Sequence, residues 1–241
     1  MQKQRLDVHL ANKKLVQSRS QAESLIRLGK VKVDGQVVSK PGFLVSEHHQ
    51  VQLAAGEQYV GRAGLKLASV ATALNLDFAG KTVLDVGSST GGFTDYALQH
   101  GAKKVFAVDV GTEQLHPSLR RDKRIELHEK TDIRDFIPSE PVDIVVMDVS
   151  FISLREILPH IATIATANTQ IVAMLKPQFE AGKEQVNKGV IKNDSVRRQI
   201  LKDFEAWTKR YFVTIDKRDS EVAGGKGNRE RFYLLKTIVN S

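Results

Sequence analysis

The segment LDVGSSTGGFTDYALQHGAKKVFAVDV, residues 84–110, decides the fold. It begins with a short apolar run that ends in a glycine-rich turn, continues as a helix-like stretch, and closes with a second apolar run. A strand, a tight turn, a helix and a second strand form the βαβ unit of a parallel sheet. Asp85 precedes the turn and Asp109 ends the second run. Because ligands of open α/β sheets bind at the carboxyl ends of the strands, both acids are predicted to face one site.

The same alternation continues through the chain from Lys81 onward. Short runs rich in Val and Ile are separated by helix-like stretches, which is typical of a parallel sheet with helices on both faces. The last two runs, 211–222 and 231–239, have no helix between them, and this predicts an antiparallel pair. The fold class is therefore α/β with a Rossmann-like sheet. The runs are TVLDVG, KVFAVDV, RIELHE, VDIVVMDV, TQIVAMLKP, YFVTIDKRDSEV and RFYLLKTIV.

The glycine turn, residues 87–92, leaves several interpretations open. Its glycines can simply permit a tight connection between a strand and a helix. A phosphate-binding nucleotide loop needs a lysine after its last glycine, and a dinucleotide turn needs the spacing Gly-x-Gly-x-x-Gly. The turn GSSTGG has neither feature.

A sulfonium nucleoside, S-adenosylmethionine, suits the acids better because it carries an amino group and a ribose diol but no phosphate. Asp85 is expected near its amino-acid end and Asp109 at the ribose hydroxyls. Asp132, after the third strand, is expected at the adenine amino group. The predicted cofactor-binding residues are Asp85, Gly87, Ser88, Ser89, Thr90, Gly91, Gly92, Phe93, Thr94, Asp109 and Asp132.

The composition of the chain excludes several classes of protein and of functional site. The chain has 241 residues, 41% of them hydrophobic, so it can bury a core. It contains no cysteine, which excludes disulfides, zinc thiolate sites and cysteine nucleophiles. Its seven histidines show no metal-binding spacing, and no metal site is predicted. The polar N-terminus and the lack of a membrane-spanning apolar run predict a cytoplasmic protein.

The net charge of +8 favours a polyanionic partner, and the first 60 residues carry 9 Lys/Arg against 5 Asp/Glu. Residues 5–53 predict two helices and then a hairpin at Asp34-Gly35. Ser18 is expected to cap the second helix, with Gln21 completing a capping box. The basic residues here form either a solvated surface or a face for RNA phosphates. They are Lys13, Lys14, Arg19, Arg27, Lys30 and Lys32.

The pattern RLD…SRSQAESLIRLGKVKVDGQVV…KPG resembles the alpha-L RNA-binding domain, an α+β module that binds structured RNA. Residues 54–62 are expected to be the linker. We therefore predict an RNA-binding domain at 1–58 and a catalytic domain at 59–241.

The motifs LDVGSSTGGFTD, VDVG, MDVSFISL, LKPQFE and KGVIKN resemble the TlyA family, in which this RNA-binding domain precedes an FtsJ-like methyltransferase. The resemblance implies methyl transfer from S-adenosylmethionine to the ribose 2′-hydroxyl of a cytidine in ribosomal RNA. Members of this family also carry the older name hemolysin. Two rival functions stay open: an RNA-binding ribosome-assembly factor with a vestigial methyltransferase fold, and a cytolysin.

A ribose hydroxyl is a poor nucleophile, so a base must help to remove its proton. The Lys-Asp-Lys-Glu set of FtsJ-like enzymes maps by resemblance onto Lys66, Asp148, Lys176 and Glu230. Lys176 is the expected base, because a charge directly after a buried strand is costly without a function. Around Glu230 the sequence departs from the family pattern, since arginines flank it on both sides and Ser-Glu replaces Ser-Pro at 220–221. Either the loop differs locally or the arginines face RNA.

Overall fold

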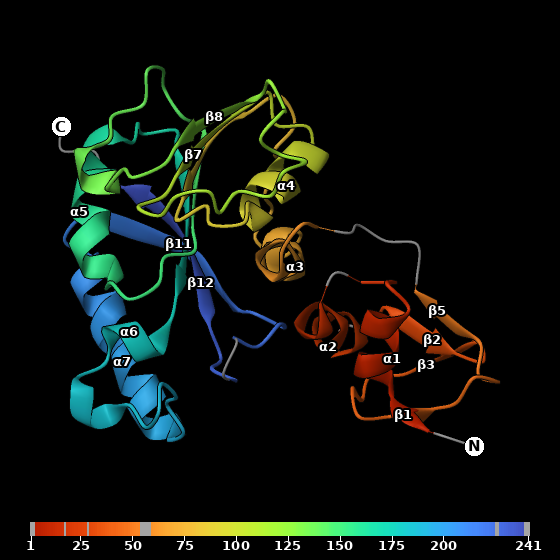
Figure 1. The fold of residues 1–241 in the computed structure, drawn as a ribbon. Coiled ribbons are helices and arrows are strands. Elements are labelled where there is room, and N and C mark those ends of the chain that lie inside the picture. Colours follow the sequence, from red (N-terminus) through yellow and green to blue (C-terminus); the bar gives the residue numbers. More distant parts are fainter. Residues whose placement is uncertain (1–2, 17, 28, 54–58, 225–226, 239–241) are drawn as a thin grey trace.

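The computed structural model describes residues 3–16, 18–27, 29–53, 59–224 and 227–238. Figure 1 shows a large domain built on one sheet, with a small domain beside its helix α3. The expected domain boundary, between residues 58 and 59, lies at the edge of 54–58, which are outside the described residues.

The large domain contains a seven-stranded sheet in the order β11-β12-β10-β9-β6-β7-β8. The five strands β10, β9, β6, β7 and β8 are parallel, whereas β12 is antiparallel to both β10 and β11. The predicted parallel sheet and antiparallel end are thus confirmed. The strand bounds are β6 Thr82–Val86, β7 Lys104–Val108, β8 Ile125–His128, β9 Ile144–Met147, β10 Gln170–Leu175, β11 Phe212–Asp219 and β12 Arg231–Thr237.

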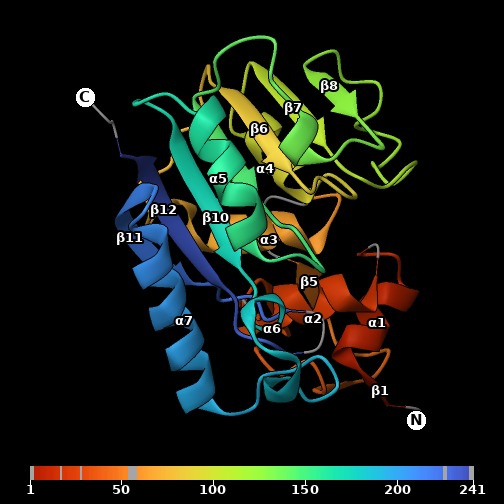
Figure 2. The ribbon, with the colours of Figure 1, turned by 90° about the vertical axis from the view of Figure 1, so that its left-hand side faces the viewer.

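Helices cover both faces of the sheet (Figure 2). Alternate strand residues enter two apolar cores, as the period of two in a strand requires. Val83 and Val146 pack with α3 and α4, while Leu84 and Val145 pack with α5 and α7. Both faces of β6 are therefore buried, which explains its continuous apolar run. The helices are α3 Arg62–Ala71, α4 Gly92–Gln99, α5 Leu154–Ile164, α6 Pro177–Glu180 and α7 Asp194–Thr208, with short 3-10 turns at Ile133–Asp135 and Lys183–Gln185.

The small domain follows the sequence prediction closely. The Ser18 hydroxyl accepts from the Gln21 backbone N–H at 3.2 Å, which caps α2 as expected. Asp34 and Gly35 both have positive φ and join two antiparallel strands. Its elements are β1 Gln4–Arg5, α1 Leu6–Asn12, α2 Arg19–Arg27, β2 Val31–Val33, β3 Gln36–Val37, β4 Leu44–Val45 and β5 Val51–Leu53.

The two domains meet at residues 59–64. The Gln21 side chain donates to the Tyr59 carbonyl at 3.2 Å, and the Val60 N–H donates to Asp95 of α4 at 2.7 Å. The ring of Tyr59 is buried against Tyr96, with centroids 5.3 Å apart. The connection therefore packs directly on the helix that follows the glycine turn.

Candidate active site

A pocket of about 420 Å³ opens at the carboxyl ends of β6, β7, β8 and β9. This is the edge at which the sequence placed a ligand, because parallel strands bring their carboxyl ends together. Its lining combines aliphatic side chains with the carboxylates of Asp109, Asp132 and Asp148, which follow β7, β8 and β9. The lining includes Val86, Gly87, Ser89, Val108, Asp109, Asp132, Ile133, Asp148, Val149, Ser150, Phe151 and Ile157.

Asp85 lies behind the pocket wall, on β6, with 1% of its surface exposed. One carboxylate oxygen, Oδ2, accepts from the Thr94 N–H at 2.9 Å and from the Thr94 hydroxyl at 2.7 Å. The other oxygen, Oδ1, is buried and has no hydrogen-bond partner among the described residues. Burial raises the pKa of Asp85 to about 7, the Thr94 bonds oppose the rise, and the charges of Asp148 and Asp109 add to it. An unpaired buried oxygen of this kind fits a cationic ligand group.

The predicted turn residues divide into two groups. Gly87 and Ser89 line the pocket. Three others pack inward: Phe93 against Phe232, Gly91 beside Leu115 and Leu119, and Thr94 on Asp85. A Cβ on Gly92 would lie 2.7 Å from the Cβ of Ala63, so this glycine permits the close approach of α4 to α3. Thr90 lies against Gly61, just before α3, because a Cβ on Gly61 would lie 2.7 Å from the Thr90 hydroxyl. The Ser88 hydroxyl is buried and has no hydrogen-bond partner among the described residues.

Asp109 and Asp132 both reach the pocket, but each already has protein partners. Asp109 accepts from the Ser89 N–H at 2.8 Å and the Gly111 N–H at 2.7 Å, which ties the tip of β7 to the glycine turn. Asp132 accepts from the Arg134 guanidinium at 2.6 Å. That guanidinium lowers the pKa of Asp132, so its carboxylate stays ionised.

Two of the four predicted catalytic residues, Lys176 and Asp148, form a pair at the pocket rim. The Nζ of Lys176 is 2.6 Å from Asp148 Oδ1 and donates to the Ser150 hydroxyl at 2.6 Å. The contact with Asp148 is a close ion pair whose angle is not that of a hydrogen bond. Lys176 is largely buried and follows β10 directly, while Asp148 and Ser150 follow β9. Neighbouring parallel strands therefore bring the three groups together.

The other two predicted catalytic residues also pair: Lys66 of α3 lies 2.6 Å from Glu230, which precedes β12. Both side chains are buried, with 6% and 3% exposure. Glu230 also faces the backbone of Gly224, because a Cβ there would lie 2.7 Å from its Oε1. Four residues spread over 165 positions of the sequence thus form two ion pairs, Lys66–Glu230 and Lys176–Asp148.

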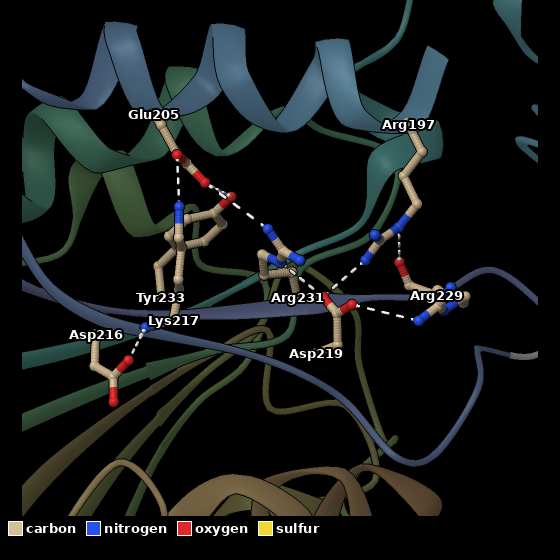
Figure 3. A network of polar contacts seen from close by, with 8 residues as sticks. All are labelled: Arg197, Glu205, Asp216, Lys217, Asp219, Arg229, Arg231 and Tyr233. Carbon is tan, nitrogen blue, oxygen red and sulfur yellow. Dashed lines mark hydrogen bonds and ion pairs between the residues drawn. The ribbon is translucent and has the colours of Figure 1, made fainter. Parts of the chain in front are cut away.

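The arginines that flank Glu230 have a partner within the protein. Figure 3 shows Arg229 and Arg231 converging on Asp219, at 3.6 Å and 2.6 Å, together with Arg197 of α7 at 2.8 Å. Alternate residues of an extended segment point to opposite sides, so these arginines turn toward α7 while Glu230 turns toward Lys66. Although burial opposes it, hydrogen bonds from Arg231 and Arg197 lower the pKa of Asp219. Of the two explanations open from sequence, a local difference in the loop fits this arrangement.

The predicted RNA-binding cations lie on the surface of the small domain, with one difference between them. Arg19 is held by the buried Asp7 at 2.8 Å and lies 3.7 Å from Glu23. Arg5 also pairs with Asp7, at 2.9 Å. All six side chains are exposed: Lys13, Lys14, Arg19, Arg27, Lys30 and Lys32.

Two residues of the rim had no predicted role. Ser150 touches Lys176, and Glu180 bonds to the first turn of α5. Ser150 belongs to the motif MDVSFISL and Glu180 to the motif LKPQFE, but their roles are apparent only from the residues they contact in the structure. Within the described part of the chain, no helix is long and apolar enough to cross a membrane. Nor do three or more His, Asp or Glu side chains of that part gather as a metal site.

Comparison with known proteins agrees with this geometry. Residues 59–237 match the FtsJ-like methyltransferase family and residues 4–51 match the S4 domain. The 16S/23S rRNA (cytidine-2′-O)-methyltransferase TlyA of Mycobacterium tuberculosis is 38% identical over 97% of this chain and 90% of its own. Hemolysin A of Brachyspira hyodysenteriae is 36% identical over 98% of this chain and 100% of its own. A solved Streptococcus thermophilus structure that carries a hemolysin name has a TM-score of 0.73 at 37% identity, covering 99% of this chain and 90% of that one.

Proposed function

Because the chain belongs to the TlyA family of FtsJ-like methyltransferases, we propose that it transfers a methyl group from S-adenosylmethionine to a cytidine ribose 2′-hydroxyl in ribosomal RNA. The observation that carries this proposal is the ion pair of Lys176 with Asp148 at the rim of the strand-tip pocket. Ribosomal RNA as the substrate supports a cytoplasmic location for the enzyme.

The pocket residues fit the cofactor. Val108 and Ile133 offer apolar surface for the adenine, and Asp109 offers carboxylate oxygens to the ribose hydroxyls. The unpartnered Oδ1 of Asp85 is a ready acceptor for the methionine ammonium. Asp132, held by Arg134, keeps lone pairs for the adenine amino group. When bound, S-adenosylmethionine supplies a methyl group activated by a positive sulfur.

The protein must orient the hydroxyl and take up its proton. As the base, Lys176 first releases to solvent the proton that pairs it with Asp148; it then takes up the 2′-hydroxyl proton, and the ammonium–carboxylate pair at 2.6 Å is restored. Ser150 fixes the direction of the amine through its hydroxyl. The Lys66–Glu230 pair completes the set and orders the wall between α3 and β12.

RNA docking belongs to the small domain. The exposed cations Lys13, Lys14, Arg27, Lys30 and Lys32 contact phosphates, and this contact weakens with added salt. Arg19 is exposed on the same surface, where the buried Asp7 beneath it holds its guanidinium. The rival of a vestigial fold was motivated by the departures from the family pattern around Glu230, which include its flanking arginines. Their engagement by Asp219 removes that reason.

The test compares ribosomal RNA from cells with and without the gene by mapping 2′-O-methyl positions. A cytidine methylated only in the presence of the gene is expected. With purified protein, Lys176→Ala and Asp148→Ala should each lower the transfer rate by at least about 100-fold. Calorimetry should find S-adenosylmethionine affinity within about threefold of the native value. Lys202→Ala, on the exposed face of α7, is the matched control. Undiminished transfer by both rim variants rules out the assignment, and so does an unchanged methylation map.

A further inference from the structure

Two segments meet at the rim of the pocket. Residues 148–153 follow β9 and lead into α5, and residues 176–180 follow β10 and form α6. Figure 2 shows α6 just below the first turn of α5. Lys176 begins the second segment and reaches across to Asp148 and Ser150 of the first, both at 2.6 Å.

The contacts between the segments continue in register beyond the lysine. The ring of Phe179 lies against that of Phe151, with centroids 5.2 Å apart. One position later, Glu180 accepts from the Ser153 hydroxyl and the Leu154 N–H, both at 2.7 Å. The order of partners along one segment matches their order along the other.

These contacts differ in how firmly they are anchored. Phe151 is 92% exposed, so its ring contact excludes little water. The Glu180 carboxylate is 1% exposed, and each of its oxygens has a donor. One donor, the Leu154 N–H, belongs to the first turn of α5, where helix N–H groups lack partners in the helix and favour a negative charge. Arg155 adds its guanidinium at 3.6 Å.

Burial raises the pKa of Glu180, and the bonds from Ser153 and Leu154 oppose the rise. A buried carboxylate is retained only where its hydrogen bonds are complete. The contact between the segments is therefore buried and hydrogen-bonded at Glu180 and exposed at Phe151.

We propose that Glu180 is a positioning residue for Lys176. It clamps the segment after β10 to the start of α5 and so fixes the lysine amine beside Asp148 and Ser150. The proposal rests on the proposed function, since it gives that reaction one more residue. Misplacing a reacting group by about 1 Å costs on the order of 100-fold in rate, so a clamp four residues from the amine matters.

The experiment uses the full-length protein with Glu180→Ala, Glu180→Gln and the control Glu156→Ala. Glu156 is an exposed acid in the same first turn of α5. We expect Glu180→Ala to lower kcat at least about tenfold. The KM for S-adenosylmethionine should change by less than about threefold. Glu180→Gln should recover most of kcat, because its amide oxygen still accepts from Leu154.

Hydrogen exchange of the ligand-free protein gives a readout that does not depend on activity. Amides of 148–154 and 176–180 should exchange faster in Glu180→Ala but not in Glu156→Ala. Native kcat in Glu180→Ala overturns the proposal. So does an equal loss of kcat and cofactor affinity, or a Gln variant no better than Ala. Faster exchange in Glu180→Ala with no methylation by the native protein would instead reject the proposed function while leaving the clamp in place.

Discussion

Replacing Asp85 by asparagine should make the ligand-free protein more stable at alkaline pH. The pKa of this buried carboxyl is raised from its ordinary 3.8 to about 7. A raised acid pKa means that the folded state holds its proton more tightly than the unfolded chain does. The stabilisation is therefore complete below about pH 4 and is lost as the pH rises through about 7.

The size of the effect follows from the two pKa values. They differ by about 3, and each pH unit between them corresponds to about 1.4 kcal/mol, so the ionised carboxylate costs about 4 kcal/mol. An asparagine stays neutral, and its oxygen can accept both bonds from Thr94. Its amide nitrogen would take the place of the unpartnered Oδ1, at a cost of about 1–3 kcal/mol. A net gain of about 2 kcal/mol remains at about pH 8.

Urea unfolding of both proteins between about pH 5 and pH 8.5 measures this difference. The gain should grow with pH and vanish at the acidic end. Asp77→Asn removes the same charge from an exposed site and should show no such trend. Asp85→Asn should also lose the thermal stabilisation that S-adenosylmethionine gives the native protein, because its ammonium partner is gone. A stability difference that is independent of pH would refute the reasoning.

Two further changes test the packing around α3. Glu230→Gln leaves the buried ammonium of Lys66 unpaired and should lower the free energy of unfolding by about 3 kcal/mol, while adding Lys66→Met should restore most of it. Equal stability of the single and double variants in urea titrations would contradict this. Gly92→Ala places a methyl 2.7 Å from the Cβ of Ala63 and 2.8 Å from the N of Gly64, and should cost about 1–3 kcal/mol. An unchanged urea midpoint would show that the two helices can separate freely.

The local features of the fold were predictable from sequence, because neighbouring residues determine them. The Ser18 cap and the Asp34-Gly35 turn are short-range geometry. The seven apolar runs became the seven strands of the sheet. The placement of β12 between β10 and β11 needs pairing across the sequence, so the absence of a helix predicted an antiparallel partner but not its position.

Side-chain partners were less predictable than side-chain types. The tips of the parallel strands carry Asp85, Asp109, Asp132 and Asp148, which patterning located. Patterning could not show that Asp132 is held by a neighbouring guanidinium.

Close packing was equally hidden from the sequence. Gly92 permits the close contact of α3 and α4, two helices that begin 30 residues apart, at 62 and 92. Glu180 finds its donors 26 and 27 residues earlier in the chain. Contacts between residues so far apart in the sequence can be identified only when the order of the strands in the sheet is known.

The insertion of β12 into the sheet also sets when the enzyme can begin to work. Lys66 emerges early in translation, but Glu230 follows 164 residues later, directly before the strand β12 that lies between β11 and β10. A nascent chain that stops short of β12 has an incomplete sheet and only one of the two lysine–acid pairs. We therefore expect a chain truncated before β12 to be inactive as a methyltransferase.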